Sequence, residues 1–254
     1  MTLALTRTVP PARAAELVAR TVRVDELDAG TRDAAFALFD ALYEGSDRAR
    51  FDRDLAEKHR VILLRDRDTG ALKGFSTLHL RTLHDLPGRP TVVFSGDTVV
   101  DRACWGQKQL QAEWVRVMLR LKLRHPHRPL YWFLISKGYR TYLLLANAFP
   151  RAVPRHDRAD LPRLRAALDR VAAERFGGEY DPASSRVLYR TPHERVRDGV
   201  APVDDALLRN PHVRFFVQRN PGHARGEELA CLADVRLGDL LRVVGRVLWS
   251  RARR

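Results

Sequence analysis

Two apolar stretches flank one amphipathic stretch near the middle of the chain. Thr91–Val100 is rich in β-branched residues and Leu130–Ile135 is apolar throughout, which predicts two buried strands. Between them, Gln107–Arg124 carries apolar residues at helical spacing, and His125–Pro129 ends that pattern. The order strand, helix, strand predicts a βαβ unit whose two strands are parallel.

The preceding sequence predicts a helix and a β-hairpin. We expect Thr31 to be the N-cap of a helix that runs to about Tyr43. Val61–Leu64 and Leu72–Leu80 are apolar runs around a short glycine-containing turn, which predicts antiparallel pairing. A further short strand is expected at Val22–Leu27. Strands and helices in this order predict a mixed sheet with helices on its faces.

The sequence after the βαβ unit predicts three more helices and two strands. The helices are expected at Tyr139–Phe149, at Asp160–Phe176 with Asp160 as the N-cap, and at Arg236–Trp249. Val213–Gln218 is interpreted as a strand that pairs with Glu228–Val235. The stretch 179–211 is expected to be irregular.

Length and composition predict one globular domain. The 254 residues are 45% hydrophobic and contain no apolar run of the roughly 20 residues that a membrane span needs. We expect a domain over residues 21–235, with 22–149 as its core and 150–235 as a C-terminal decoration. A loosely ordered lead, 1–20, precedes it, and a basic amphipathic helix, 236–254, follows it.

The cysteines and the N-terminal sequence predict a cytoplasmic protein without a metal centre. Cys104 and Cys231 form neither a disulfide framework nor a metal motif, and the nine histidines have no metal-binding spacing. The N-terminus lacks the long apolar segment of a secretory signal. Cys104 as a nucleophile has no histidine at a suggestive position to support it.

The net charge of +14 raises the question of an anionic partner. Many of the arginines are interspersed with acidic residues, and no nucleic-acid-binding motif accompanies them, so we do not expect nucleic acid. For the basic C-terminal helix, packing on the domain and peripheral contact with an anionic membrane are both open interpretations.

The loop between the Thr91–Val100 strand and the following helix is the first candidate site. It contains Trp105, Gly106, Gln107, Lys108 and Gln109. Backbone N–H groups at the N-terminus of a helix favour phosphate, and glycine lets the backbone approach it closely. The alternative interpretation is an ordinary strand-to-helix turn, because a single glycine is a weak signal.

Asp97 is the second candidate, because it interrupts an apolar strand. A carboxylate in such surroundings tends to have a raised pKa, which suits a general base. The alternative is a structural aspartate at a bulge, which the neighbouring Gly96 suggests.

The order of predicted elements over Val22–Phe149 resembles the GNAT superfamily of acyl-CoA N-acyltransferases. That family binds the CoA pyrophosphate in a loop of the form Q/R-x-x-G-x-G/A. Here Gly106 matches the first glycine and Lys108 replaces the second, where it could supply a charge to the same phosphate. Leu144 stands at the usual tyrosine position before the pair Ala148-Phe149.

The resemblance implies a mixed, mostly antiparallel sheet flanked by helices, with a C-terminal helical and strand extension. It implies transfer of an acyl group from acyl-CoA, or from an acyl carrier protein, to a small-molecule or lipid-linked amine. The implied roles are base for Asp97 or Glu44, acid for Tyr139 or Tyr142, carbonyl polarisation by the N–H groups of Val99 and Val100, and a cofactor contact for Ser136.

Two alternatives to this function remain at the level of sequence. One is a long-chain acyltransferase resembling acyl-homoserine-lactone synthases. The other is a catalytically silent GNAT-like module that binds a partner or an anionic surface, which the altered loop and the missing tyrosine favour. Hydrolysis through an acyl-serine or of a nucleotide is not expected, since neither a G-x-S-x-G elbow nor a Walker loop is present.

Overall fold

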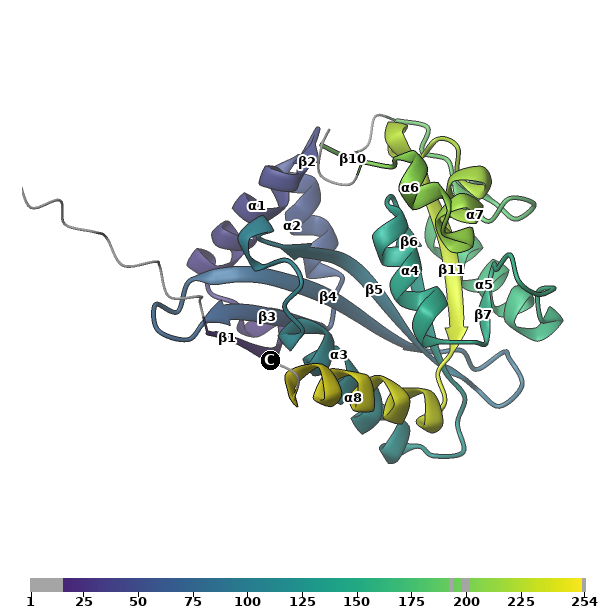
Figure 1. Cartoon of the computed structure of the whole chain (residues 1–254), viewed down its shortest axis with the longest axis horizontal. Coiled ribbons are helices and arrows are strands. Elements are labelled where there is room, and N and C mark those ends of the chain that lie inside the picture. The colour runs from purple at the N-terminus through teal and green to yellow at the C-terminus, as the bar shows by residue number, and fades with distance from the viewer. Residues whose placement is uncertain (1–15, 192–193, 198–201, 253–254) are drawn as a thin grey trace, which may run out of the picture.

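A nine-stranded mixed sheet with helices on both faces forms the molecule (Figure 1). The computed structural model describes residues 16–191, 194–197 and 202–252. The strand order is β1-β3-β4-β5-β6-β11-β9-β8, with β7 also paired to β11. The strands span Leu17–Arg23 (β1), Arg60–Asp66 (β3), Leu72–Thr82 (β4), Thr91–Val100 (β5), Leu130–Ser136 (β6), Ala152–Val153 (β7), Tyr180–Asp181 (β8), Arg186–Val187 (β9) and Glu228–Asp234 (β11). A separate two-stranded sheet joins β2 (Tyr43–Glu44) to β10 (Arg195–Val196).

Only one pair of neighbouring strands in this sheet, β5 and β6, is parallel among the described residues. The βαβ unit predicted from the sequence is therefore confirmed, and α3 (Gln109–Arg124) is its crossover helix. The predicted hairpin is confirmed as β3 and β4. The expected mixed, mostly antiparallel sheet is confirmed as well.

Alternating side chains of the strands form two apolar layers. In β3, Ile62 and Leu64 pack in the cluster that includes α3, α4 (Tyr139–Ala148), α7 (Pro211–Arg219) and α8 (Leu237–Ala252). Val61 and Leu63 belong to the opposite face, with α1 (Ala29–Leu42) and α2 (Arg48–Ala56). Further along the sheet, α5 (Pro162–Phe176) covers that same face. Because successive residues of a strand point to opposite faces, these fully apolar strands bury both sides.

Several predicted element boundaries are wrong. The N-cap of α1 is Asp28, whose carboxylate accepts from the backbone N–H of Thr31 at 2.6 Å. The first strand starts at Leu17 and ends at Arg23, so the last residues of the predicted lead belong to the sheet; residues 1–15 lie outside the described part. The N-cap of α5 is Leu161, not Asp160, which instead pairs with Arg165.

The predicted strand at Val213–Gln218 is wrong, because this segment is helix α7. Asn210 caps it through a bond to the N–H of His212 at 2.9 Å, and Pro211 occupies its first turn. Val213 and Phe216, three positions apart, are fully buried in the large apolar cluster. Burial of this stripe overrides the β-propensity of the sequence. Strand β11 pairs instead with β6, β7 and β9, and the short helix α6 (Asp205–Leu208) precedes α7.

The C-terminal helix packs on the domain through Leu240, which is fully buried, while Leu241 is exposed. Within the described residues, no helix has the length and apolar character needed to cross a membrane.

Candidate active site

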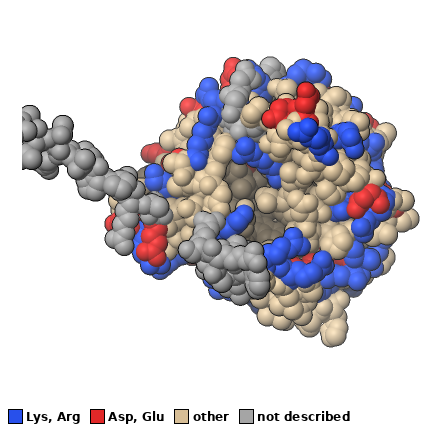
Figure 2. All heavy atoms as spheres, viewed as in Figure 1, with Lys and Arg blue, Asp and Glu red and all other residues tan. Residues whose placement is uncertain are grey.

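The separation of β5 from β6 opens a cavity through the sheet. Their pairing begins at Thr91 opposite Leu130 and ends at Ser95 opposite Leu134, after which each strand stays paired only with its outer neighbour. A cavity of about 560 Å³ lies there. Its lining includes residues from both faces, among them Phe39, Phe51, Leu110 and Trp114. Figure 2 shows the molecule hollowed at its centre, with lysine and arginine side chains around the opening.

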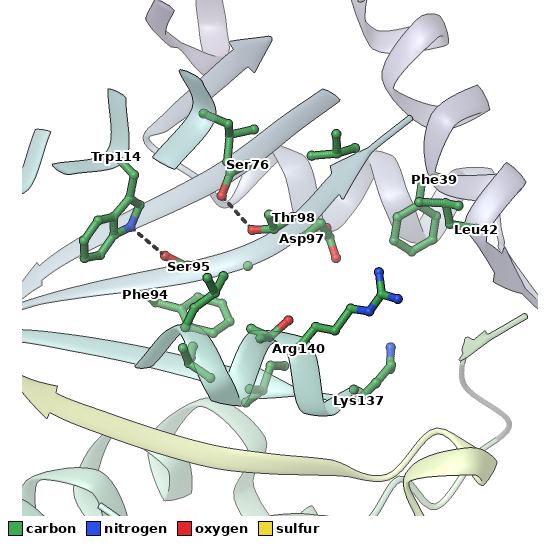
Figure 3. Close-up of a pocket in the computed structure, with 18 of the residues that line it drawn as sticks. Phe39, Leu42, Ser76, Phe94, Ser95, Asp97, Thr98, Trp114, Lys137 and Arg140 are labelled. Carbon is green, nitrogen blue, oxygen red and sulfur yellow. Dashed lines mark hydrogen bonds between the residues drawn. The ribbon is translucent and has the colours of Figure 1, made fainter. Parts of the chain in front are cut away.

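A β-bulge directs Asp97 into this cavity. In the β4–β5 pair, Ser76 faces Thr98 and Leu78 faces Ser95, so Gly96 and Asp97 share the single partner Thr77. The bulge requires glycine, because a Cβ on Gly96 would lie 2.5 Å from Thr77 Oγ1 and 2.8 Å from Lys58 Cε. Figure 3 shows the Asp97 carboxylate turned toward the same space as Lys137 and Arg140.

The Asp97 carboxylate has no hydrogen bond or ion pair with any residue that the structure describes. The pKa of Asp97 is raised from 3.8 to about 7. Burial is the largest cause and the charge of Asp54 is the second, while Lys58 and Lys137 act in the opposite direction. Loss of hydration disfavours the charged form, and a neighbouring carboxylate adds repulsion. A carboxylate with this pKa can accept a proton from a bound molecule near neutral pH.

A polar network lies at the same end of the cavity. Lys137 Nζ lies 3.4 Å from a carboxylate oxygen of Glu228 and 3.9 Å from one of Glu194, and both acidic side chains are buried. Tyr189 donates to Glu228 at 2.7 Å, and Arg50 reaches Glu194 at 3.4 Å. The acidic groups are therefore compensated by cations and hydroxyls, as buried charges must be.

The loop after β5 leaves a helix N-terminus open toward the cavity. Gly106 has φ of +86°, and a Cβ there would meet nothing within 4 Å. The residue at the N-cap position of α3, Lys108, makes no capping bond, and the first turn holds no acidic side chain. The guanidinium of Arg140 lies 4.6 Å from the ring centre of Trp105. N–H groups of a first turn without a side-chain cap, the helix dipole and a nearby arginine together favour an anion.

Five of the site residues predicted from the sequence line the cavity: Asp97, Val100, Trp105, Gly106 and Gln107. Trp105 also donates its indole N–H to the carbonyl of Val100 at 2.8 Å, which fixes the loop against the end of β5.

The other predicted residues lie outside the cavity lining. Lys108 and Gln109 start α3, and the side-chain oxygen of Gln109 is buried without a hydrogen bond to any described residue. Val99 is fully buried in the core, and Ser136 donates to the carbonyl of Gly138 at 2.6 Å. Glu44 pairs with Arg195 across the two-stranded sheet.

Both predicted tyrosines belong to α4 and are buried in the core. Tyr139 is 6% exposed, and Tyr142 is fully buried with its hydroxyl donating to the carbonyl of Pro154 at 3.2 Å. Burial raises the pKa of Tyr142 well above its usual value. A phenol held in this way is directed at the backbone and away from the cavity.

Replacing Tyr142 with phenylalanine is expected to affect stability and not turnover. The substitution removes one buried hydrogen bond and should lower the free energy of unfolding by about 0.5–1.5 kcal/mol. Urea denaturation and steady-state kinetics of Tyr142→Phe check both parts. A loss of kcat beyond tenfold with an unchanged fold would show that the hydroxyl takes part in the reaction.

Cys104 lines the cavity, but its surroundings favour the thiol. Burial, and next the charge of Asp101, raise the pKa of Cys104. A nucleophilic cysteine requires the thiolate, which cationic neighbours stabilise.

Sequence reasoning missed Lys137 and Arg140. A signal was present: Ser136-Lys137-Gly138 follows an apolar strand parallel to β5. The carboxyl ends of parallel strands meet at one edge of a sheet, so polar residues there were to be expected beside Asp97. The carboxylates of Asp54, Glu194 and Glu228 come from distant segments, and nothing in the sequence pattern brings them together.

The observed arrangement agrees with the one that the resemblance over Val22–Phe149 implies. It consists of a helix, a hairpin, two parallel strands that separate, and a helix that connects those two strands. The fold is GNAT-like. No protein-family model matches the chain, and no curated protein matches it. Within the described residues, no group of three His, Cys, Asp or Glu side chains could hold a metal ion.

Solved structures that are similar to part of this chain include an acetyltransferase, an acyl-CoA N-acyltransferase and an N-acetyltransferase. An acetyltransferase from Trypanosoma brucei has 20% identity and a TM-score of 0.37, covering 57% of this chain and 100% of its own. An acyl-CoA N-acyltransferase from Pseudomonas aeruginosa has 17% identity and a TM-score of 0.39, covering 53% and 88%. A GNAT family N-acetyltransferase from Escherichia coli, in complex with CoA, has 15% identity and a TM-score of 0.38, covering 62% and 74%.

Proposed function

We propose that this protein is an acyltransferase that moves an acyl group from acyl-CoA to an amine. The observation that carries the proposal is the cavity through the sheet, with the Asp97 carboxylate at the bulge beside it, unpaired among the residues that the structure describes. A cavity lined from both faces of the sheet has room for a thioester and an amine to reach the same point from different directions. Reaction by direct attack needs this geometry, because both substrates must be bound together.

The donor side of the cavity is assigned to the loop around Gly106 and the first turn of α3. Here N–H groups without a side-chain cap and the guanidinium of Arg140 fit the CoA pyrophosphate. Lys108, at the N-cap position of α3, supplies a further positive charge. The pantetheine arm then extends along β5 into the space between the separated strands. An acyl carrier protein would present the same arm without the nucleotide.

The acceptor side is assigned to the end of the cavity lined by Asp97 and the network around Lys137. The amine nitrogen attacks the thioester carbon, the carbon–sulfur bond breaks, and the amine proton passes to Asp97. The N–H group of Val100, in β5 beyond the bulge, is the proposed donor to the carbonyl oxygen, because Val100 lines the cavity. Thiols ionise at a pKa of about 8.5, so the departing thiolate takes its proton from water without a dedicated acid.

A thermal-shift titration tests the donor assignment. A ligand that binds only the folded state at 100 times its Kd stabilises it by about 2.7 kcal/mol. We expect CoA and acyl-CoA to raise Tm in a concentration-dependent way, and adenosine, which lacks the phosphates, to have little effect. Amine-dependent release of free thiol then tests catalysis. Binding of CoA without thiol release for any amine would favour the silent module, and absence of binding would contradict the proposal.

A further inference from the structure

Part of the cavity lining is apolar and belongs to the large apolar cluster on the α3 face of the sheet. This apolar arm is formed by Leu110 and Trp114 of α3, Trp132 and Leu134 of β6, Ala148 of α4 and Val243 of α8. Among described residues, neither α3 nor α8 contributes a charged side chain to the cavity lining, and α4 contributes only Arg140 in its first turn.

Two indole rings form a fixed apolar wall where the strands separate. Trp114 and Trp132 both donate their N–H groups to Ser95 Oγ, at 3.3 and 2.9 Å, and Ser95 is the last residue of β5 paired with β6. The ring centres lie 4.5 Å apart, and Phe149 packs at 5.5 Å from Trp132. Since their polar atoms are bonded to serine, the rings offer only carbon to the arm. Figure 3 shows Trp114 bonded to Ser95, on the far side of Asp97 from Lys137.

The position of the arm relative to Asp97 decides what it can hold. With a thioester carbonyl near Asp97, the acyl group is the part of the substrate that extends away from the charged end. An acetyl group ends at its single methyl carbon and leaves the arm without contacts. Water gains little in the arm, because a buried water needs two to four polar partners. A hydrocarbon chain fits the lining.

We propose that the apolar arm binds the acyl chain of a medium- or long-chain acyl-CoA, so that the protein transfers fatty acyl groups in preference to acetyl. This inference rests on the proposed function and specifies its donor. Trp114 and Trp132 limit the length of the chain, and Ala148 and Val243 determine the width of the arm.

The first test compares the affinities of CoA, acetyl-CoA, hexanoyl-CoA, octanoyl-CoA and decanoyl-CoA by calorimetry with the full chain. Each buried methylene should tighten binding by about fourfold until the arm is full. Equal affinities for acetyl-CoA and octanoyl-CoA would overturn the inference and leave acyl transfer standing. Absence of binding by every member of the series, CoA included, would overturn both.

Two variants locate the chain. Ala148→Phe fills the arm from α4, and we expect the ratio of octanoyl-CoA to acetyl-CoA affinity to fall at least tenfold. Val243→Phe does the same from α8, which keeps the test valid should one variant fold poorly. Leu123→Phe, at a position of α3 that is 60% exposed and outside the lining, is the matched control and should keep the wild-type ratio. An unchanged ratio in a folded arm variant would place the chain elsewhere and overturn the inference.

Discussion

Asp97→Asn is expected to reduce kcat by roughly 10²- to 10⁴-fold, the usual contribution of a general base. Asparagine keeps the shape of the side chain and removes its ability to take the amine proton. Affinity for acyl-CoA should change little, because the donor loop around Gly106 is left intact. Steady-state kinetics with saturating acyl-CoA check the prediction. Asp66→Asn, in the hairpin away from the cavity, is the control.

The pH profile gives a sharper test of the same assignment. Only the ionised Asp97 accepts a proton, so kcat/KM should rise with pH through about 7 and level off above it. In Asp54→Asn the repulsive charge is gone, so the pKa of Asp97 falls and the rise moves to lower pH. If kcat/KM of Asp54→Asn rises over the same pH range as in the wild type, the titrating group is not Asp97.

The same ionisation has a consequence for stability. Folding raises the pKa of Asp97 above 3.8, so the folded state holds this proton more tightly than the unfolded state does. The contribution of Asp97 to the free energy of unfolding therefore falls as pH rises from about 4 to about 7. Asp97→Asn should melt at a higher temperature than the wild type at pH 8, and the difference should shrink toward pH 4.

Gly106→Val is expected to weaken acyl-CoA binding by roughly 10- to 100-fold, which corresponds to loss of one or two phosphate hydrogen bonds. The backbone φ of +86° is strained for valine, so the loop must move, although the added side chain meets no neighbour. The strain of about 1–3 kcal/mol should lower Tm by about 2–12 °C.

Gly70→Val is the matched control for this substitution. Gly70 has φ of +72°, also has open space around its Cβ position, and lies at the turn between β3 and β4, away from the cavity. Both variants should lose similar stability, and only Gly106→Val should lose affinity for CoA. Equal CoA affinity in the two would remove the loop from the binding site.

The spacing of apolar residues predicted the strands and helices whose apolar residues recur regularly along the chain. It failed where contacts with distant segments determine the secondary structure. The bounds of β5 match the prediction, because its apolar run is buried on both faces. The VRFFVQ segment resembles a strand in isolation, yet Asn210 and Pro211 start a helix there. The local sequence does not show that this segment packs against α4. It does show the Asn-Pro pair that starts the helix.

The candidate site was predictable where its residues are close in sequence. Asp97 and the Gly106 loop are both at one strand end, and the structure brings them to one cavity. The resemblance implied an acid role for Tyr139 or Tyr142, which precede the pair Ala148-Phe149, but their positions on the helix direct both side chains into the core. Residues such as Glu194 and Glu228 join the cavity only through the topology of the sheet, which the pattern of one segment cannot specify.

A structure of the protein crystallised with CoA tests the central claim most directly. The account predicts the pyrophosphate against the backbone of the Gly106 loop and the first turn of α3, and the thiol between the separated ends of β5 and β6 beside Asp97. CoA bound anywhere else, or no CoA bound at concentrations well above those of a cell, would contradict it.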